Sequence, residues 1–246
     1  MIDILFARTF MIVGAMLLLT AVTAKINRVY ETAIEFWLTL IGTFALLFAV
    51  MGFSDQFPLN LVLLGAFSLA IGWSIGPTIE HLGARFKLRK FLKDSGTPLK
   101  KGQHATPEQL AKFEQVFDKL DYHSEWQNTI MLAFLGTALA VISTACLVFT
   151  TDINFDFLGG FLFVALLMLV VMGLINAFFI KSKMVSLIRA YIGAIVFTLY
   201  LLYDFNRLEQ KAGDDSWSTA INISLNIYLD IINLFIDLLE ILAESN

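Results

Sequence analysis

The segment NISLNIYLDIINLFIDLLEILAE, residues 222–244, is strongly apolar and still carries several acidic residues. It exceeds the ~20 residues that a helix needs to cross a bilayer. At helical spacing its polar residues form a single stripe, with Ile, Leu, Phe and Tyr over the rest of the surface. A carboxylate near the centre of a bilayer costs about 2.5–3.5 kcal/mol, so we expect the stripe to face the interior of a helix bundle. The stripe comprises Asn222, Asn226, Asp230, Asn233, Asp237, Glu240 and Glu244.

The whole chain has the composition of a polytopic membrane protein. Of its 246 residues, 58% are hydrophobic and only 15% are charged, and the mean hydropathy is +0.75. These values exclude an ordinary soluble core and predict an all-α integral membrane protein. Seven apolar segments of about the length of a span predict a seven-transmembrane-helix bundle. The predicted spans are residues 6–24, 35–53, 58–76, 129–150, 157–180, 185–206 and 219–243.

The distribution of Lys and Arg predicts the orientation. Seven spans place 14 of these residues on one side of the membrane and three on the other. Because basic loops stay in the cytoplasm, we expect the N-terminus outside and the C-terminus in the cytoplasm. No targeting segment is recognisable, which favours a bacterial inner membrane; a eukaryotic version would occupy a membrane of the endoplasmic-reticulum type.

A basic cytoplasmic insertion, residues 81–127, separates the third and fourth spans. It is expected to bind anionic lipid headgroups or a partner protein. Within it, Thr106, Pro107 and Gln109 have the pattern of a helix N-cap, first residue and capping-box partner. The apolar face that follows, Leu110, Phe113, Phe117 and Leu120, predicts a short amphipathic helix on the membrane or on the bundle. The single cysteine, Cys146, is expected to be a small buried residue.

A second acid, Asp204, ends the sixth predicted span. Folding the chain about Trp217 sets Asp204 opposite Asp230 on adjacent antiparallel helices. Two carboxylates in contact cannot both ionise cheaply, so they share one proton and form a pH switch. Two alternatives remain open: Arg207 is a counter-ion that holds Asp204 ionised, or the acids only clamp the two helices together.

Four motifs resemble the Bax inhibitor-1 family: IGPTIE at 75–80, FLGG at 157–160, YD at 203–204 and YLDIINLF at 228–235. The resemblance implies a seven-helix membrane fold with a central acidic C-terminal helix, which the other helices surround. It also implies a pH-sensitive calcium leak gated by an acidic pair that maps onto Asp204 and Asp230. Some members pair the first acid with an arginine in the second helix, and residues 35–53 contain none.

The leading hypothesis is therefore a cation leak, with calcium as the permeant ion and no cofactor. Carboxylate and amide oxygens suit hard cations, so Asp204 and Asp230 are also candidates for a weak calcium site. The residues expected to line the pathway are Asn226, Asn233, Asp237, Glu240 and Glu80.

Two other functions compete with a leak. The helices could be a scaffold whose insertion binds a membrane-anchored AAA protease or a stress or cell-death regulator. The two acids also invite comparison with intramembrane aspartyl proteases, but Ile227–Asp230 lacks the glycine of their second motif, so we expect no enzyme. Apart from the lipid bilayer and such a regulator, no partner is expected, and nucleic acid is excluded.

Overall fold

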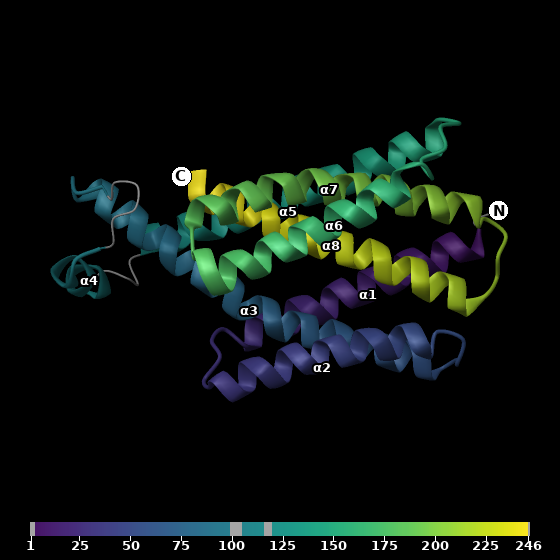
Figure 1. The fold of residues 1–246 in the computed structure, drawn as a ribbon, viewed down its shortest axis with the longest axis horizontal. Coiled ribbons are helices and arrows are strands. Elements are labelled where there is room, and N and C mark those ends of the chain that lie inside the picture. Colours follow the sequence, from purple (N-terminus) through teal and green to yellow (C-terminus); the bar gives the residue numbers. More distant parts are fainter. Residues whose placement is uncertain (1–2, 99–104, 116–119, 246) are drawn as a thin grey trace.

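The computed structural model describes residues 3–98, 105–115 and 120–245, and these ranges contain helices and no strand (Figure 1). Six helices are long and apolar enough to cross a membrane, which confirms the all-α membrane class. The predicted seventh span is not among these six, and the count of seven stays a prediction. The helices are α1 (Ile4–Ile26), α2 (Ala33–Gly52), α3 (Leu59–Asp94), α4 (Pro107–Glu114), α5 (Leu120–Thr150), α6 (Leu158–Ile175), the π-helical turn η1 (Asn176–Ile180), α7 (Lys183–Gln210) and α8 (Trp217–Ser245).

Helix α3 is longer than its predicted span and takes up much of the insertion. It continues to Asp94, and α5 already begins at Leu120, so the connection between them is residues 95–119. The reason lies in apolar residues that keep helical spacing beyond the membrane segment. Leu82 and Phe86 are buried, and Phe86 packs on Trp126 of α5 with ring centroids 5.5 Å apart.

Helix α4 lies where the capping pattern predicts it. Thr106 accepts a hydrogen bond from the Gln109 N–H, and the Gln109 side chain accepts one from the Thr106 N–H. Phe113 is buried and packs on Phe91 of α3, with ring centroids 5.7 Å apart. Phe113 therefore seats α4 on α3, whereas Leu110 of the same predicted face is exposed. Phe117 and the Leu120 side chain lie outside the described part of the chain.

One prediction about α5 is wrong. Cys146 is exposed on the surface of this helix. An apolar helix in a membrane turns one face to lipid and another to protein, so a small apolar residue is not necessarily buried in the protein core.

Helices α1 and α3 pack closely along glycines. A Cβ atom on Gly76 would lie 1.8 Å from the carbonyl oxygen of Asn27. The next residue, Pro77, has no N–H and leaves the carbonyl of Trp73 without its helical partner. The side chain of Asn27 donates a 2.9 Å hydrogen bond to that carbonyl. Gly76 thus leaves room for the end of α1, and Asn27 at that end satisfies the backbone carbonyl that Pro77 leaves free.

Helix α8 is enclosed by its neighbours. It contacts α1, α3, α5 and α7, and no residue from Trp217 to Glu244 is exposed. Figure 1 shows α8, in yellow, running alongside α7 with its C-terminal end beside α3 and α5. Tyr228, at mid-helix, is fully buried and shares a 2.6 Å hydrogen bond with Thr20 of α1. Other helices present exposed apolar side chains suited to contact lipid. On α6, for example, Phe161 and Phe163 are exposed.

Candidate functional site

The polar stripe of α8 faces the other helices, as its spacing predicts. Asp230, Asp237 and Glu240 are buried, with exposed fractions of 6%, 2% and 6%. Asn226 and Asn233 are half-buried, and the Asn233 amide donates a 2.8 Å hydrogen bond to the Leu229 carbonyl of its own helix. The acids therefore lie within the bundle and not toward lipid.

The structure brings Asp204 of α7 and Asp230 of α8 together. Asp204 is 3% exposed and Asp230 is 6% exposed, and their carboxyl groups are neighbours that interact where α7 packs on α8. Oδ2 of Asp230 receives no N–H or O–H hydrogen bond from any described residue. Ionised carboxylates only accept hydrogen bonds, so the contact is a hydrogen bond only when one of the two acids keeps a proton.

Arg207 lies on the same face of α7 as Asp204, nearer the C-terminal end of the helix. Its Nη1 is 3.7 Å from Oδ1 of Asp204, three residues earlier in the helix. Its guanidinium also lies 5.7 Å from the centroid of the Tyr203 ring. Because the Arg207 side chain is 40% exposed, it is a loose counter-ion for Asp204.

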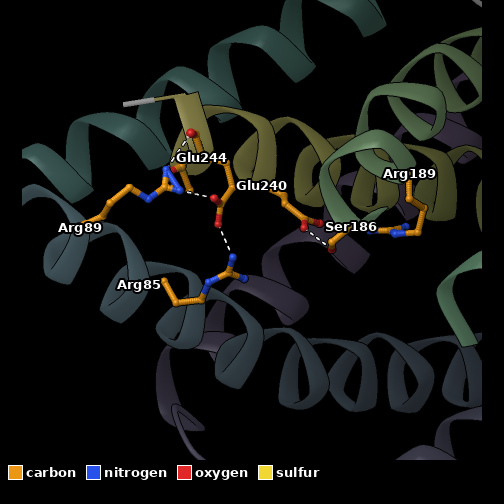
Figure 2. Close-up of polar contacts among 7 residues, drawn as sticks. Arg85, Arg89, Ser186, Arg189, Glu240 and Glu244 are labelled. Atoms are coloured by element: carbon orange, nitrogen blue, oxygen red, sulfur yellow. Dashed lines mark hydrogen bonds and ion pairs between the residues drawn. The ribbon is translucent and has the colours of Figure 1, made fainter. Parts of the chain in front are cut away.

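The acids nearer the C-terminus of α8 are paired with a cation from α7. Arg189 lies 3.2 Å from Oδ1 of Asp237 and 3.2 Å from Oε2 of Glu240. The hydroxyl of Ser186 donates a hydrogen bond to the other oxygen of Glu240 (Figure 2). Asp237 and Glu240, which the sequence predicts to line the pathway, thus share one arginine of α7.

The last acid, Glu244, is held by α3. Arg85 and Arg89 form ion pairs with its two carboxylate oxygens (Figure 2), and Arg89 also donates a 2.7 Å hydrogen bond to its carbonyl. The C-terminal end of α8 is thereby fixed to the part of α3 that extends beyond the predicted span. We name Arg85, Arg89 and Arg189 the arginine clamp.

Glu80 does not join this set. It is half-buried on α3 and forms no ion pair with a described residue. Within the described ranges no group of three or more His, Cys, Asp or Glu side chains is placed to hold a metal ion. A calcium ion at Asp204 and Asp230 would thus have only these two carboxylates as acidic ligands among the described residues.

The sequence missed the arginine clamp and Ser186. Ser186 and Arg189 are three residues apart on α7, so both reach one turn of α8. Arg85 and Arg89 are four residues apart and reach one carboxylate of α8 in the same way. The spacing of Ser186 and Arg189, and that of Arg85 and Arg89, can be seen in the sequence. The acid of α8 that each pair contacts cannot be predicted from it.

Comparison with known proteins identifies the family. The chain matches the family described as inhibitor of apoptosis-promoting Bax1 over residues 3–88 and 121–246. The chain belongs to the Bax inhibitor-1 family. The resemblance predicted from the four motifs is confirmed, and residues 89–120, which contain α4, fall outside the match.

Relatives of this family member occur in viruses, bacteria and plants. It is 35% identical over 119 residues to a Golgi anti-apoptotic protein of Vaccinia virus (strain Lister), which covers 48% of either chain. The match thus spans about half the length of this viral relative. It is 26% identical to an uncharacterized protein of Campylobacter jejuni, over all of this chain and 90% of the relative. Protein LIFEGUARD 1 of Arabidopsis thaliana is 27% identical over 85% of this chain and 71% of the plant protein.

Proposed function

We propose that this Bax inhibitor-1 family protein is a calcium leak regulated by the proton that Asp204 and Asp230 share. The observation that carries the proposal is the contact of these two buried acids within the helix bundle. Intramembrane acids that face a bundle interior mark ion and proton pathways. We assign the chain no enzymatic activity.

In this proposal α8 is the seventh and central membrane helix. Its enclosure by α1, α3, α5 and α7 supports that role. The arginine clamp gathers the ends of α3 and α8 and the start of α7 at the basic end of the molecule. Basic ends stay in the cytoplasm, so the C-terminus is cytoplasmic and the N-terminus is outside. The match to the Campylobacter jejuni protein over the whole of this chain is in keeping with a bacterial source, for which the membrane would be the inner one.

The proton controls the leak through the attraction between α7 and α8. With one proton, Asp204 and Asp230 can share a hydrogen bond and hold the helices together. Without it, two negative charges face each other in a low dielectric and repel. The two ionised carboxylates also attract a cation. Loss of the proton therefore both separates the helices and creates a binding position for the ion.

The arginine clamp forms a second barrier on the cytoplasmic side. Asp237, Glu240 and Glu244 lie beyond Asp230 along the stripe, and each is paired with arginine in the arrangement described here. A calcium ion leaving along the stripe meets these cations. We infer that passage also requires α8 to shift from Arg189 of α7 or from Arg85 and Arg89 of α3.

The test is calcium flux into liposomes that contain the purified protein and a trapped calcium indicator, over a series of pH values from 5.5 to 8. We expect wild-type flux to change with pH, and Asp204→Asn and Asp230→Asn to lose most of that dependence. Asp152→Asn is the matched control, because Asp152 is exposed in the α5–α6 connection. Unchanged pH dependence in Asp230→Asn, with a folded protein, would overturn the proposal.

A scaffold role remains the competing function, and one observation favours it. Residues 89–120 lie outside the family match, so this connection offers a surface of its own to a membrane protease or a stress regulator. Replacing residues 97–118 with a Gly/Ser linker separates the two functions. A leak should survive the replacement, whereas capture of a regulator should be lost with it.

A further inference from the structure

A polar cavity opens at the end of α1, away from the stripe of α8. It has a volume of about 380 Å³ and is bounded by the α1–α2 connection, the first turn of α2 and Trp73 of α3. Its walls are Ile26, Asn27, Arg28, Val29, Glu31, Glu35 and Trp73. The volume is that of a small-molecule site, and its position, where two membrane helices end and begin, is at the level of lipid headgroups.

Part of this wall is rigid. The Trp73 indole donates a 3.1 Å hydrogen bond to Oε1 of Glu35, and the Glu31 N–H donates a 2.8 Å bond to Oε2. Asn27 is fixed by its bond to the Trp73 carbonyl, which Pro77 leaves free. The carboxylate of Glu35 and the indole of Trp73 are therefore positioned before any ligand arrives.

Two charged side chains in the wall have no ionic or hydrogen-bonding partner among the described residues. Arg28 forms no ion pair or side-chain hydrogen bond with the residues that the structure describes, and neither does the carboxylate of Glu31. Both are exposed. The cavity thus combines one free cation with two acids and an aromatic ring, so both signs of charge lie around one small space.

We propose that this cavity binds the zwitterionic headgroup of a phosphoethanolamine-type membrane phospholipid. The Arg28 guanidinium matches a phosphate, which it binds through two parallel hydrogen bonds. The primary ammonium is placed at Glu31 and Glu35, whose carboxylates accept its hydrogen bonds. A quaternary ammonium has no N–H to donate, so choline headgroups fit this acidic half less well.

The apolar rim identifies the ligand as a lipid. Ile26 and Val29 line the cavity and are each 65% exposed. On α2, Ile34 and Trp37 are also exposed, at 71% and 48%. Acyl chains attached to a bound headgroup would lie against these side chains, whereas a free phosphoethanolamine has no apolar part that could contact them. Trp at this depth is typical of membrane interfaces.

The site is independent of the proposed leak, because it shares no residue with the acid pair or the arginine clamp. Its binding is measured without any flux. The experiment is native mass spectrometry of the full-length detergent-solubilised protein with an equimolar mixture of dioleoyl phosphatidylethanolamine, phosphatidylglycerol and phosphatidylcholine. We expect the ethanolamine lipid to be retained in preference to both others.

Two variants and two matched controls assign the binding to the cavity. Losing a charge-assisted hydrogen bond should lower retention of the ethanolamine lipid about tenfold in Arg28→Gln and in Glu31→Gln. Lys25→Gln removes a neighbouring charge that does not line the cavity, and Glu209→Gln removes an exposed acid near the end of α7. Both controls should retain the lipid as the wild type does.

Four results would overturn the proposal. Equal retention of phosphatidylglycerol would mean that the phosphate alone is recognised, and equal retention of phosphatidylcholine would remove the role of the carboxylates. Displacement of the lipid by an equal concentration of soluble glycerophosphoethanolamine would show that the ligand is not a membrane lipid. Equal losses in the variants and the controls would place the binding elsewhere.

Discussion

Gly193 of α7 and Asp237 of α8 are in direct contact. A Cβ atom on the glycine would lie 2.0 Å from Oδ2 of Asp237. The other oxygen of the same carboxylate lies 3.2 Å from Arg189, also on α7. Because Gly193 has no side chain, the backbone of α7 can approach Asp237 while Arg189, one turn earlier, pairs with the same carboxylate. The geometry of the Arg189–Asp237 ion pair therefore depends on Gly193.

We therefore expect Gly193→Ala to destabilise the bundle. The added methyl group must displace the Asp237 carboxylate from Arg189, and overpacking of this kind costs about 1–3 kcal/mol. Thermal unfolding of the purified protein in detergent should show a lower Tm. Gly160→Ala on α6 is the matched control, because a Cβ there meets nothing within 4 Å. Equal Tm values for the two variants would contradict the close contact.

A larger loss is expected from Gly76→Ala on α3. Here the new Cβ would lie 1.8 Å from the carbonyl oxygen of Asn27, and a backbone atom cannot move aside as a side chain can. Helices α1 and α3 would have to separate, at a cost of about 3 kcal/mol or more. Gly65→Ala on the same helix meets its nearest atom at 3.8 Å and should leave the Tm near that of the wild type. A Gly76→Ala protein as stable as Gly65→Ala would disprove this packing.

The sequence predicts those features that depend on one helix at a time. The stripe of α8 follows from steps of three and four, and the capping box of α4 follows from Thr106, Pro107 and Gln109. Burial of Asp230 and Asp237 could be predicted because a carboxylate on the lipid-facing side of a membrane helix is energetically costly. These signals are local, and the structure retains each of them.

Contacts between distant segments could not be predicted in the same way. Arg85 and Glu244 are 159 residues apart, and the basic run of residues 85–93 is expected at the surface from composition alone. Which arginine meets which acid depends on how far α3 continues past the membrane. That length follows from the packing of Leu82 and Phe86 on α5, which a pattern of charge does not reveal.

The ion pair between Arg85 and Glu244 should contribute measurably to stability. Both side chains are largely shielded, with exposed fractions of 24% and 11%. A double-mutant cycle with Arg85→Gln and Glu244→Gln, followed by denaturant unfolding in detergent, should give a coupling energy of about 1–2 kcal/mol.

The pair Lys90–Glu125 is the internal control for that cycle. It links α3 to α5 with more exposed side chains, at 33% and 36%. Exposed pairs contribute little, so its coupling energy should be below about 0.5 kcal/mol. A coupling energy for Arg85 and Glu244 that is no larger than this would show that Glu244 is not held in the way the structure has it.

Asp214, in the turn between α7 and α8, makes the start of α8 sensitive to acid. Its carboxylate accepts hydrogen bonds of 2.7 Å from the Thr219 hydroxyl and 2.8 Å from the Ser216 N–H. These bonds, that from Thr219 above all, hold the pKa of Asp214 below its usual range. A lowered folded-state pKa stabilises the fold above the unfolded-state value of about 4, and the contribution is lost as the pH falls through the folded-state value.

Hydrogen exchange of the first turn of α8 measures this effect. After correction for the intrinsic exchange rate, protection of these amides in the wild type should be constant from neutral pH down to about pH 5. It should decrease at pH values below about 4. Asp214→Asn has no ionisation to lose, so its protection should be lower at neutral pH and nearly independent of pH. Asp215→Asn is the matched control, because the Asp215 contact to Arg8 uses only its backbone carbonyl. A wild-type profile in Asp214→Asn, or an Asp215→Asn profile as flat as that of Asp214→Asn, would contradict this origin of the acid sensitivity.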